Sequence, residues 1–184
     1  MGWERAEQYA HDALGEVEQL LQKESASGLS QPTLRRAVSS LYYAAFHLTT
    51  RGGAEALFSD KNSIDIVARS FEHTQMLQSF RSYLSESALR NPSNRGGKLF
   101  GDASTRVIEL ISKLTLGFEQ LQTERHRADY DFSTNTTFSK QKALQLLDLA
   151  REYIDALTEL HAHHPAEYSR MMVVLLFKRL SKIL

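Results

Sequence analysis

The densest cluster of ionisable and aromatic side chains in this chain spans residues 124–132, which read Glu-Arg-His-Arg-Ala-Asp-Tyr-Asp-Phe. Arg125 and Arg127 offer guanidinium groups, which bind phosphate or carboxylate through paired N–H donors. Tyr130 adds a ring that can stack or hydrogen-bond, and Asp129 follows Arg125 at the four-residue spacing of an ion pair on one helical face. These residue types together predict an anion-binding site. The alternative is a purely structural ion pair that closes the end of a helix.

A second candidate group lies earlier in the chain. Tyr43 and His47 are four residues apart, so in a helix their side chains lie one turn apart and can touch. His47 is the imidazole best placed to supply acid–base chemistry if its helix packs beside the one that carries Arg125. The alternative is a structural histidine that hydrogen-bonds a carbonyl or tyrosine.

The helix that must position Arg125 has an apolar face that leads directly to it. Steps of three and four residues connect its apolar positions, which are Val107, Ile111, Leu114, Phe118 and Leu121. The next step of four lands on Arg125. Because a guanidinium does not lose its proton, burying it unpaired is costly. We therefore expect Arg125 to face an acidic partner, solvent at a bundle end, or a second subunit or ligand.

The remaining periodicity is helical throughout and predicts an all-α fold. We expect an up-and-down bundle of four to five core helices plus a short C-terminal helix. The predicted helices cover residues 3–23, 32–51, 63–88 and 102–127, a fifth that begins after Ser139, and 166–184. Gly52 and Gly53 are expected to end the second helix, Ser63 and Asp102 to cap the third and fourth, and residues 91–98 to form a loop.

Residues 1–164 are interpreted as one bundle domain, and residues 165–184 as a helix that docks on the bundle or on a dimer partner.

The composition limits the possible partners and location of the protein. The 22 basic and 22 acidic residues cancel, so no global charge favours nucleic acid. No stretch is apolar enough to span a membrane or act as a signal sequence, so we expect a cytoplasmic protein without membrane contact.

No cofactor or metal site is expected from these residues. The chain has no cysteine, which excludes thiolate ligands and disulfides. His161, His163 and His164 lack an acidic partner at fixed spacing, and we interpret them as a solvated helix end.

Two stretches together resemble the HEPN superfamily, specifically its small prokaryotic members with an Arg-x-x-Ala-Asp-Tyr signature. Residues 41–47, Leu-Tyr-Tyr-Ala-Ala-Phe-His, are similar to that family's Tyr-Tyr-Ala-small-Phe-His helix. Residues 125–130, Arg-His-Arg-Ala-Asp-Tyr, match the signature at every fixed position. The resemblance covers about residues 35–160. It implies a helical bundle, frequent homodimers, and a setting in toxin–antitoxin, defence or RNA-processing systems.

Catalytic HEPN relatives are metal-independent endoribonucleases with an Arg-x4-6-His motif. Counted from Arg125, the histidine would stand at position 130, 131 or 132, where this chain has Tyr, Asp and Phe. The favoured hypothesis is therefore an RNA- or nucleotide-binding module without efficient catalysis. It binds through Arg125, Arg127, Asp129, Tyr130 and Tyr43.

Two alternatives stay open. One is an endoribonuclease with a variant site, in which Arg125, Tyr130 and His47 or His126 act. The other is a helical interaction module whose arginine cluster is purely structural. The resemblance also implies a homodimer and a possible nucleotidyltransferase-type partner protein.

Overall fold

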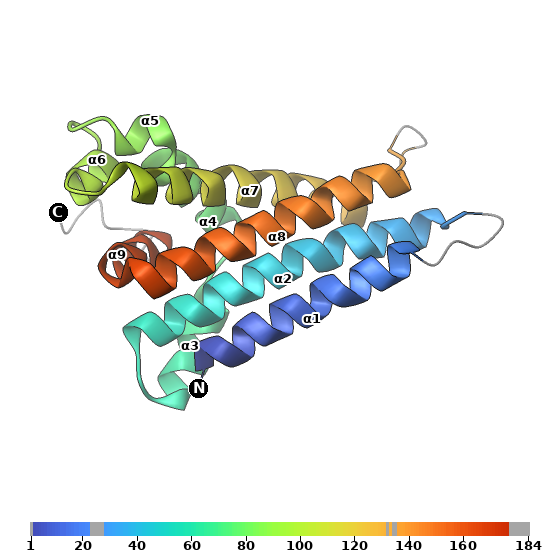
Figure 1. Cartoon of the computed structure of the whole chain (residues 1–184), viewed down its shortest axis with the longest axis horizontal. Helices are drawn as coiled ribbons and strands as arrows, with labels where there is room; N and C mark the ends of the chain where they lie inside the picture. Colours follow the sequence, from blue (N-terminus) through green and yellow to red (C-terminus); the bar gives the residue numbers. More distant parts are fainter. Residues whose placement is uncertain (1, 23–27, 132, 134–135, 177–184) are drawn as a thin grey trace.

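Four long helices form a bundle in the computed structural model, which describes residues 2–22, 28–131, 133 and 136–176. They are α1 (Gly2–Gln22), α2 (Gln31–Leu57), α7 (Thr105–Tyr130) and α8 (Lys140–His163). α2 lies against the other three, and consecutive long helices run in opposite directions (Figure 1). The prediction of an all-α helical bundle is confirmed.

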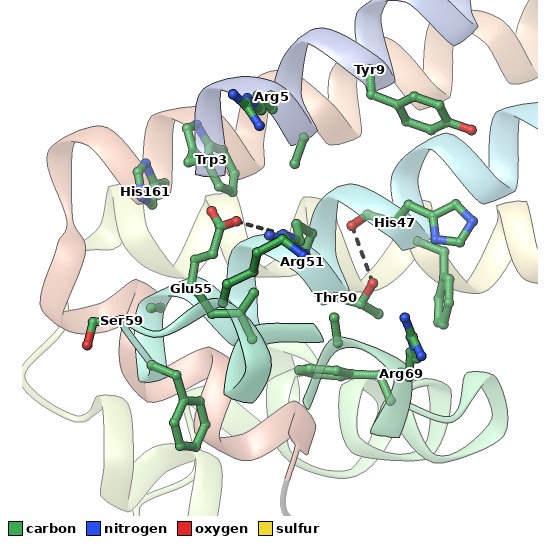
Figure 2. A pocket seen from close by; sticks show the side chains of 18 of the residues that line it. Trp3, Arg5, Tyr9, His47, Thr50, Arg51, Glu55, Ser59, Arg69 and His161 are labelled. Carbon is green, nitrogen blue, oxygen red and sulfur yellow. Dashed lines mark hydrogen bonds and ion pairs between the residues drawn. The ribbon is translucent and has the colours of Figure 1, made fainter. Parts of the chain in front are cut away.

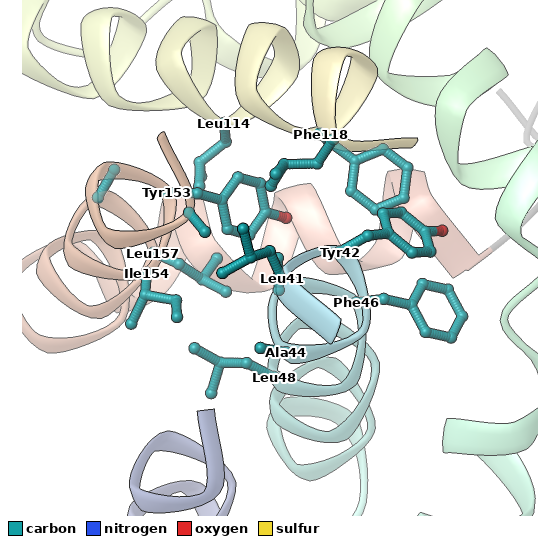
Figure 3. Packing of buried hydrophobic residues seen from close by; sticks show 14 of the residues in the cluster. Leu41, Tyr42, Ala44, Phe46, Leu48, Leu114, Phe118, Tyr153, Ile154 and Leu157 are labelled. Carbon is teal, nitrogen blue, oxygen red and sulfur yellow. The ribbon is translucent and has the colours of Figure 1, made fainter. Parts of the chain in front are cut away.

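The core lies where α2, α7 and α8 meet (Figure 3). Tyr42 from α2 packs against Phe118 from α7, and Phe118 packs in turn against Tyr153 from α8. All three rings are at most 1% exposed. The buried hydroxyl of Tyr153 lies 2.7 Å from the Thr49 hydroxyl, so its hydrogen-bonding group is satisfied inside the core. Tyr42 connects this core to the predicted site, since its neighbour Tyr43 faces Arg125.

The prediction that Gly52 and Gly53 end the second helix is wrong, because α2 continues through them to Leu57. Both glycines are buried. A methyl group at Gly52 would lie 2.3 Å from the Trp3 ring, and one at Gly53 would lie 2.9 Å from the Met172 sulfur. The glycines therefore allow α1 and the C-terminal helix to approach α2 closely, and this packing outweighs their low helix propensity.

Residues 61–100 form several short helices where one helix from residue 63 to 88 was predicted. They are α3 (Lys61–Ser70), α4 (His73–Ser79), the π-helical turn η1 (Phe80–Leu84), α5 (Glu86–Leu89) and α6 (Arg95–Phe100). The cap of α3 is Asp60 and not Ser63, since the Asp60 carboxylate accepts the Ser63 backbone N–H at 2.8 Å. At the last residue of η1, the Leu84 carbonyl accepts a hydrogen bond from the buried Thr115 hydroxyl of α7 at 2.9 Å.

The segment 91–98 was predicted as a loop, but its second half belongs to α6. Asn94 caps this helix by accepting the Gly96 backbone N–H. Gly96 and Gly97 are buried inside it because their missing side chains leave room for the backbone of residues 83 and 91. Tertiary contact again overrides the helix-breaking tendency of paired glycines.

Helix α7 begins later and ends later than predicted. Its cap is Ser104 and not Asp102, and the helix persists to Tyr130 instead of ending near residue 127. Asp102 forms an ion pair with Arg170 of the C-terminal helix, at 2.8 Å. The prediction that Ser139 caps the following helix is confirmed, since its hydroxyl accepts the Lys142 N–H.

The C-terminal helix α9 (Pro165–Leu176) packs on α2, α4 and α8 of the same chain. The rest of the predicted helix, residues 177–184, lies outside the described residues. His161 is not a solvated helix end, because its ring stacks on Trp3 with centroids 4.1 Å apart. Within the described part of the chain, no helix combines the length and apolar character that a membrane crossing requires.

Candidate functional site

The Arg125 stretch borders an open cleft of about 780 Å³ between the beginning of α2 and the end of α7. In Figure 1 these two helix ends lie together at the right of the bundle. α2 runs from the cleft to the opposite end of the bundle, the segment 61–100 connects the two helices at that opposite end, and α7 runs back to the cleft (Figure 1). This topology brings residues about 90 positions apart in the sequence to the same place. The cleft is lined by Gln31, Pro32, Arg35, Tyr43, Arg125, Ala128, Asp129 and Tyr130.

Arg125 is surrounded by tyrosine rings. Its guanidinium carbon lies 5.9, 5.3 and 5.2 Å from the ring centres of Tyr42, Tyr43 and Tyr130. Its Nη2 donates a 2.6 Å hydrogen bond to the Tyr43 hydroxyl. The side chain is only 15% exposed. Aromatic faces attract a cation, so they stabilise a guanidinium that has lost much of its water.

Asp129 is the acidic partner of Arg125, which is one of the three environments that the sequence allowed for this guanidinium. Its Oδ2 lies 2.7 Å from Arg125 Nε, as predicted for an i, i+4 pair, although this buried N–H is not aligned for a hydrogen bond. The hydroxyl of Ser39 donates to the other carboxylate oxygen. Desolvation lowers the pKa of Arg125, but the Tyr43 hydrogen bond and the charge of Asp129 outweigh it and raise the pKa. Arg125 is therefore paired within one chain and remains a cation.

Tyr130 forms the rim of the cleft and is 61% exposed. Its hydroxyl lies 3.5 Å from Arg125 Nη2, and its ring lies 5.1 Å from that of His126. The Tyr130 side chain thus borders the Arg125 guanidinium on the open side of the cleft, where solvent or a ligand can contact it directly. Nη1 of Arg125 makes no hydrogen bond with any residue that the structure describes.

Arg35 lines the cleft although the sequence did not single it out as a binding residue. Its guanidinium donates to the carbonyls of Arg127 and Ala128 at the end of α7, at 3.1 and 3.0 Å, and to the Thr136 carbonyl at 2.7 Å. A cation suits these carbonyls because the last turn of a helix exposes unpaired acceptors. Arg35 and Ser39 precede Tyr43 by eight and four residues. This helical spacing places them close to the face that carries Tyr43, and it is the sequence feature that indicates their position at the cleft.

Arg127 lies apart from the other predicted binding residues. Its Nη1 contacts Glu124 Oε2 at 2.9 Å, and Glu124 also pairs with Lys142 of α8 at 3.1 Å. Arg127 is not among the residues that line the cleft. The structure thus brings together Arg125, Asp129, Tyr130 and Tyr43, but it directs Arg127 to a separate ion-pair group between α7 and α8.

His47 also lies outside the cleft. Its ring stacks on Tyr43 with centroids 5.8 Å apart, as the spacing predicted, but it lines a second and larger pocket on the other side of Tyr43. Desolvation lowers the pKa of His47. The three residues suggested for catalysis are therefore not gathered at one point, since Tyr43 separates His47 from Arg125 and Tyr130.

His73 supports the tyrosine next to the cleft. Its Nδ1 shares a short hydrogen bond with the Tyr42 hydroxyl, and its ring stacks on Phe46 at 3.9 Å. Burial lowers the pKa of His73, and the positive charge of Arg125 lowers it further. At neutral pH the imidazole is therefore uncharged and matches the apolar face of Phe46.

We expect the free energy of unfolding to fall as the pH is lowered through about 6.5, the pKa of an unfolded-state histidine. His73 has a lower pKa when folded, so below this pH the unfolded chain binds more protons and gains stability relative to the folded chain. The stability contributed by neutral His73 is complete above that pH and is lost toward the folded pKa. Urea unfolding at a series of pH values measures the slope. His73→Gln should make it shallower, and parallel curves for variant and wild type would contradict this.

In the described residues, no three histidine, aspartate or glutamate side chains form a group that could hold a metal ion. Comparisons of the chain with protein-family models, curated proteins and solved structures give no match.

Proposed function

We propose that the chain is a HEPN-like module that binds single-stranded RNA at the cleft between α2 and α7, without efficient cleavage. The observation that carries the proposal is the position of Arg125. Its guanidinium lies in an open cleft, fixed by Tyr43 and Asp129, with Nη1 free of hydrogen bonds to described residues and the exposed Tyr130 beside it. An arginine positioned in this way is ready to bind a phosphate without losing side-chain freedom.

The same geometry supports a nucleic acid rather than a simple anion. A phosphate oxygen at Nη1 would leave the adjoining base close to the Tyr130 ring, which is 61% exposed. Stacking of a base on an aromatic ring is sequence-tolerant and typical of single-strand binding. Arg35 adds a second positive charge to the cleft, whereas Asp129 is the one carboxylate among its lining residues.

Binding without cleavage is favoured by the position of His47. A general base must reach the ribose 2′-hydroxyl within hydrogen-bonding distance, directly or through one water. His47 lines a different pocket from Arg125, and Tyr43 lies between them. The endoribonuclease hypothesis thus has an arginine but no imidazole in the cleft.

Arg125→Ala is expected to weaken binding of a fluorescently labelled single-stranded RNA by at least about tenfold, because it removes a charge-assisted contact. Fluorescence anisotropy at two or more salt concentrations measures this, and wild-type affinity should fall as salt rises. Arg127→Ala is the matched control. It removes the same charge one half-turn away, from an arginine paired with Glu124 outside the cleft, and should change affinity little.

Equal losses in both variants, or no salt-dependent binding by the wild type, would contradict the proposal and favour the structural interpretation of the Arg125–Asp129 pair. RNA cleavage that disappears in Arg125→Ala and in His47→Ala would instead establish the endoribonuclease. Homodimerisation and a nucleotidyltransferase-type partner remain predictions from the HEPN resemblance. Measurement of the mass in solution tests the first of these.

A further inference from the structure

A second pocket, of about 1050 Å³, lies between α1, α2 and α3 on the other side of Tyr43 from the RNA cleft. Figure 2 shows it with α1 above, α3 below and the His47–Glu55 part of α2 across its centre. Its volume is at the upper end of the range for small-molecule sites in proteins. Nothing in the proposed RNA-binding function uses it.

The walls of this pocket are largely apolar and aromatic. Phe46, Ile64 and Phe71 contribute buried side chains, each 6–8% exposed. Trp3, stacked on His161, closes one end, and Tyr9 contributes an exposed ring from α1. A ligand with an apolar or flat body would replace water on these surfaces, which is favourable.

The histidines in the wall add surface without charge at neutral pH. Desolvation lowers the pKa of His47, His73 and His161, all of which line the pocket. The charge of the pocket therefore comes from its arginines, one lysine and Glu55.

Two of these cations are already neutralised. Arg51 contacts Glu55 at 2.7 Å and Asp65 at 2.5 Å, and Lys61 contacts Asp65 at 3.0 Å. Figure 2 shows the Arg51–Glu55 pair across the middle of the pocket.

Arg5 on α1 and Arg69 on α3, unlike Arg51 and Lys61, keep their positive charge available to a ligand. Both are exposed at the pocket, and neither forms an ion pair with any residue in the described ranges. In Figure 2 they lie on opposite sides of the pocket, on the two helices that flank α2. The pocket thus combines a largely apolar wall, crossed by one neutralised ion pair, with two edge arginines that no described acidic residue pairs with.

We propose that this pocket binds a small amphipathic organic anion, with its apolar body between Phe46, Ile64 and Phe71 and its acidic group at Arg5 or Arg69. The arginines favour a carboxylate, sulfonate or phosphate headgroup, which a guanidinium holds through paired hydrogen bonds. The apolar interior favours a ring system or short acyl chain over a purely polar ion, because inorganic anions would gain nothing from its surface.

The test uses 8-anilinonaphthalene-1-sulfonate, an aromatic sulfonate whose fluorescence rises in apolar sites. The 184-residue chain should bind it saturably, and the double variant Arg5→Ala/Arg69→Ala should bind it about tenfold more weakly. Arg36→Ala, which removes an exposed arginine of α2 outside the pocket, is the control and should bind as the wild type does. Unchanged affinity in the double variant would overturn the proposal.

Competition then identifies the class of ligand. Octanoate and 2-naphthoate should each displace the dye, and their relative strength shows whether an aliphatic or aromatic body is preferred. Octanol has a similar chain without the charge and should displace it poorly. Equal displacement by octanol and octanoate would overturn anion recognition.

A pocket-filling variant gives an independent result. Ala68→Trp places a large ring in the lining and should abolish dye binding, with circular dichroism confirming that the helices remain. Arg125→Ala, the variant that tests the RNA cleft, should retain dye binding. The RNA-binding proposal and the anion-pocket proposal can therefore be refuted independently of each other. Retained dye binding by folded Ala68→Trp would show that the dye sits elsewhere and would overturn the assignment.

Discussion

Replacing Phe118 with alanine is expected to lower the free energy of unfolding by about 3–5 kcal/mol, the range for deleting a buried aromatic ring. Phe118 is fully buried, and its ring centre lies 5.0 Å from that of Phe80, 5.7 Å from Tyr42 and 6.4 Å from Tyr153. The cavity would therefore open between α2, α7 and α8 (Figure 3), next to Phe80 of η1. Urea or thermal unfolding followed by circular dichroism measures the loss.

Leu116→Ala is the control on the same helix, because Leu116 is 68% exposed. Its effect should stay within about 0.5 kcal/mol, as for most surface substitutions. Phe118 also supports Tyr42, whose ring faces Arg125, so RNA affinity should fall with stability in Phe118→Ala but not in Leu116→Ala. Similar losses in the two variants would contradict the position assigned to the core.

Gly97→Ala is expected to destabilise the protein by about 3 kcal/mol or more, although alanine is the better helix former. An added methyl group would lie 1.9 Å from the Asn91 carbonyl oxygen and 3.1 Å from the Pro92 nitrogen. The Asn91 carbonyl cannot easily move away, since it accepts the Asn94 N–H at 2.9 Å in the turn that begins α6. The methyl group must therefore displace α6 or disrupt this turn.

Gly15→Ala is expected to raise the free energy of unfolding, whereas Gly97→Ala lowers it. Gly15 lies inside α1, and an added methyl group would meet no atom within 4 Å apart from its chain neighbours and the backbone of its own helix. The substitution should stabilise the protein by about 0.5–1 kcal/mol through helix propensity alone. Chemical denaturation of both variants gives the comparison, and a stabilising Gly97→Ala would show that residues 95–100 are not packed as described.

The sequence predicted the parts of the site that are local. A four-residue spacing on a helix is sufficient to pair Arg125 with Asp129 and to stack Tyr43 on His47, and both contacts are present. The apolar spacing of α7 likewise predicted that Arg125 ends a buried face, and its side chain is 15% exposed. These contacts depend only on helix geometry, which places residues four apart in the sequence on the same face.

The sequence did not predict contacts between helices. Arg35 binds carbonyls more than 90 residues away, and Arg127 turns to Glu124 and Lys142 instead of the cleft. Arg35 and Arg36 lie on neighbouring faces of α2, and before the helices pack either face could meet α7. The hydrophobic periodicity of the sequence therefore does not show which arginine enters the cleft.

The sequence by itself determined that this chain folds as a helical bundle, roughly where its four long helices lie, and that Arg125 stands at the end of a buried face. Only the tertiary structure decided that the paired glycines at 52–53 and 96–97 lie inside helices, since close approach by Trp3, Met172 and the backbone of residues 83 and 91 sets their conformation. It also decided that Arg125 and His47 line separate pockets. The reason is physical: helix formation depends on neighbours in sequence, whereas the composition of a pocket depends on which helix faces pack together.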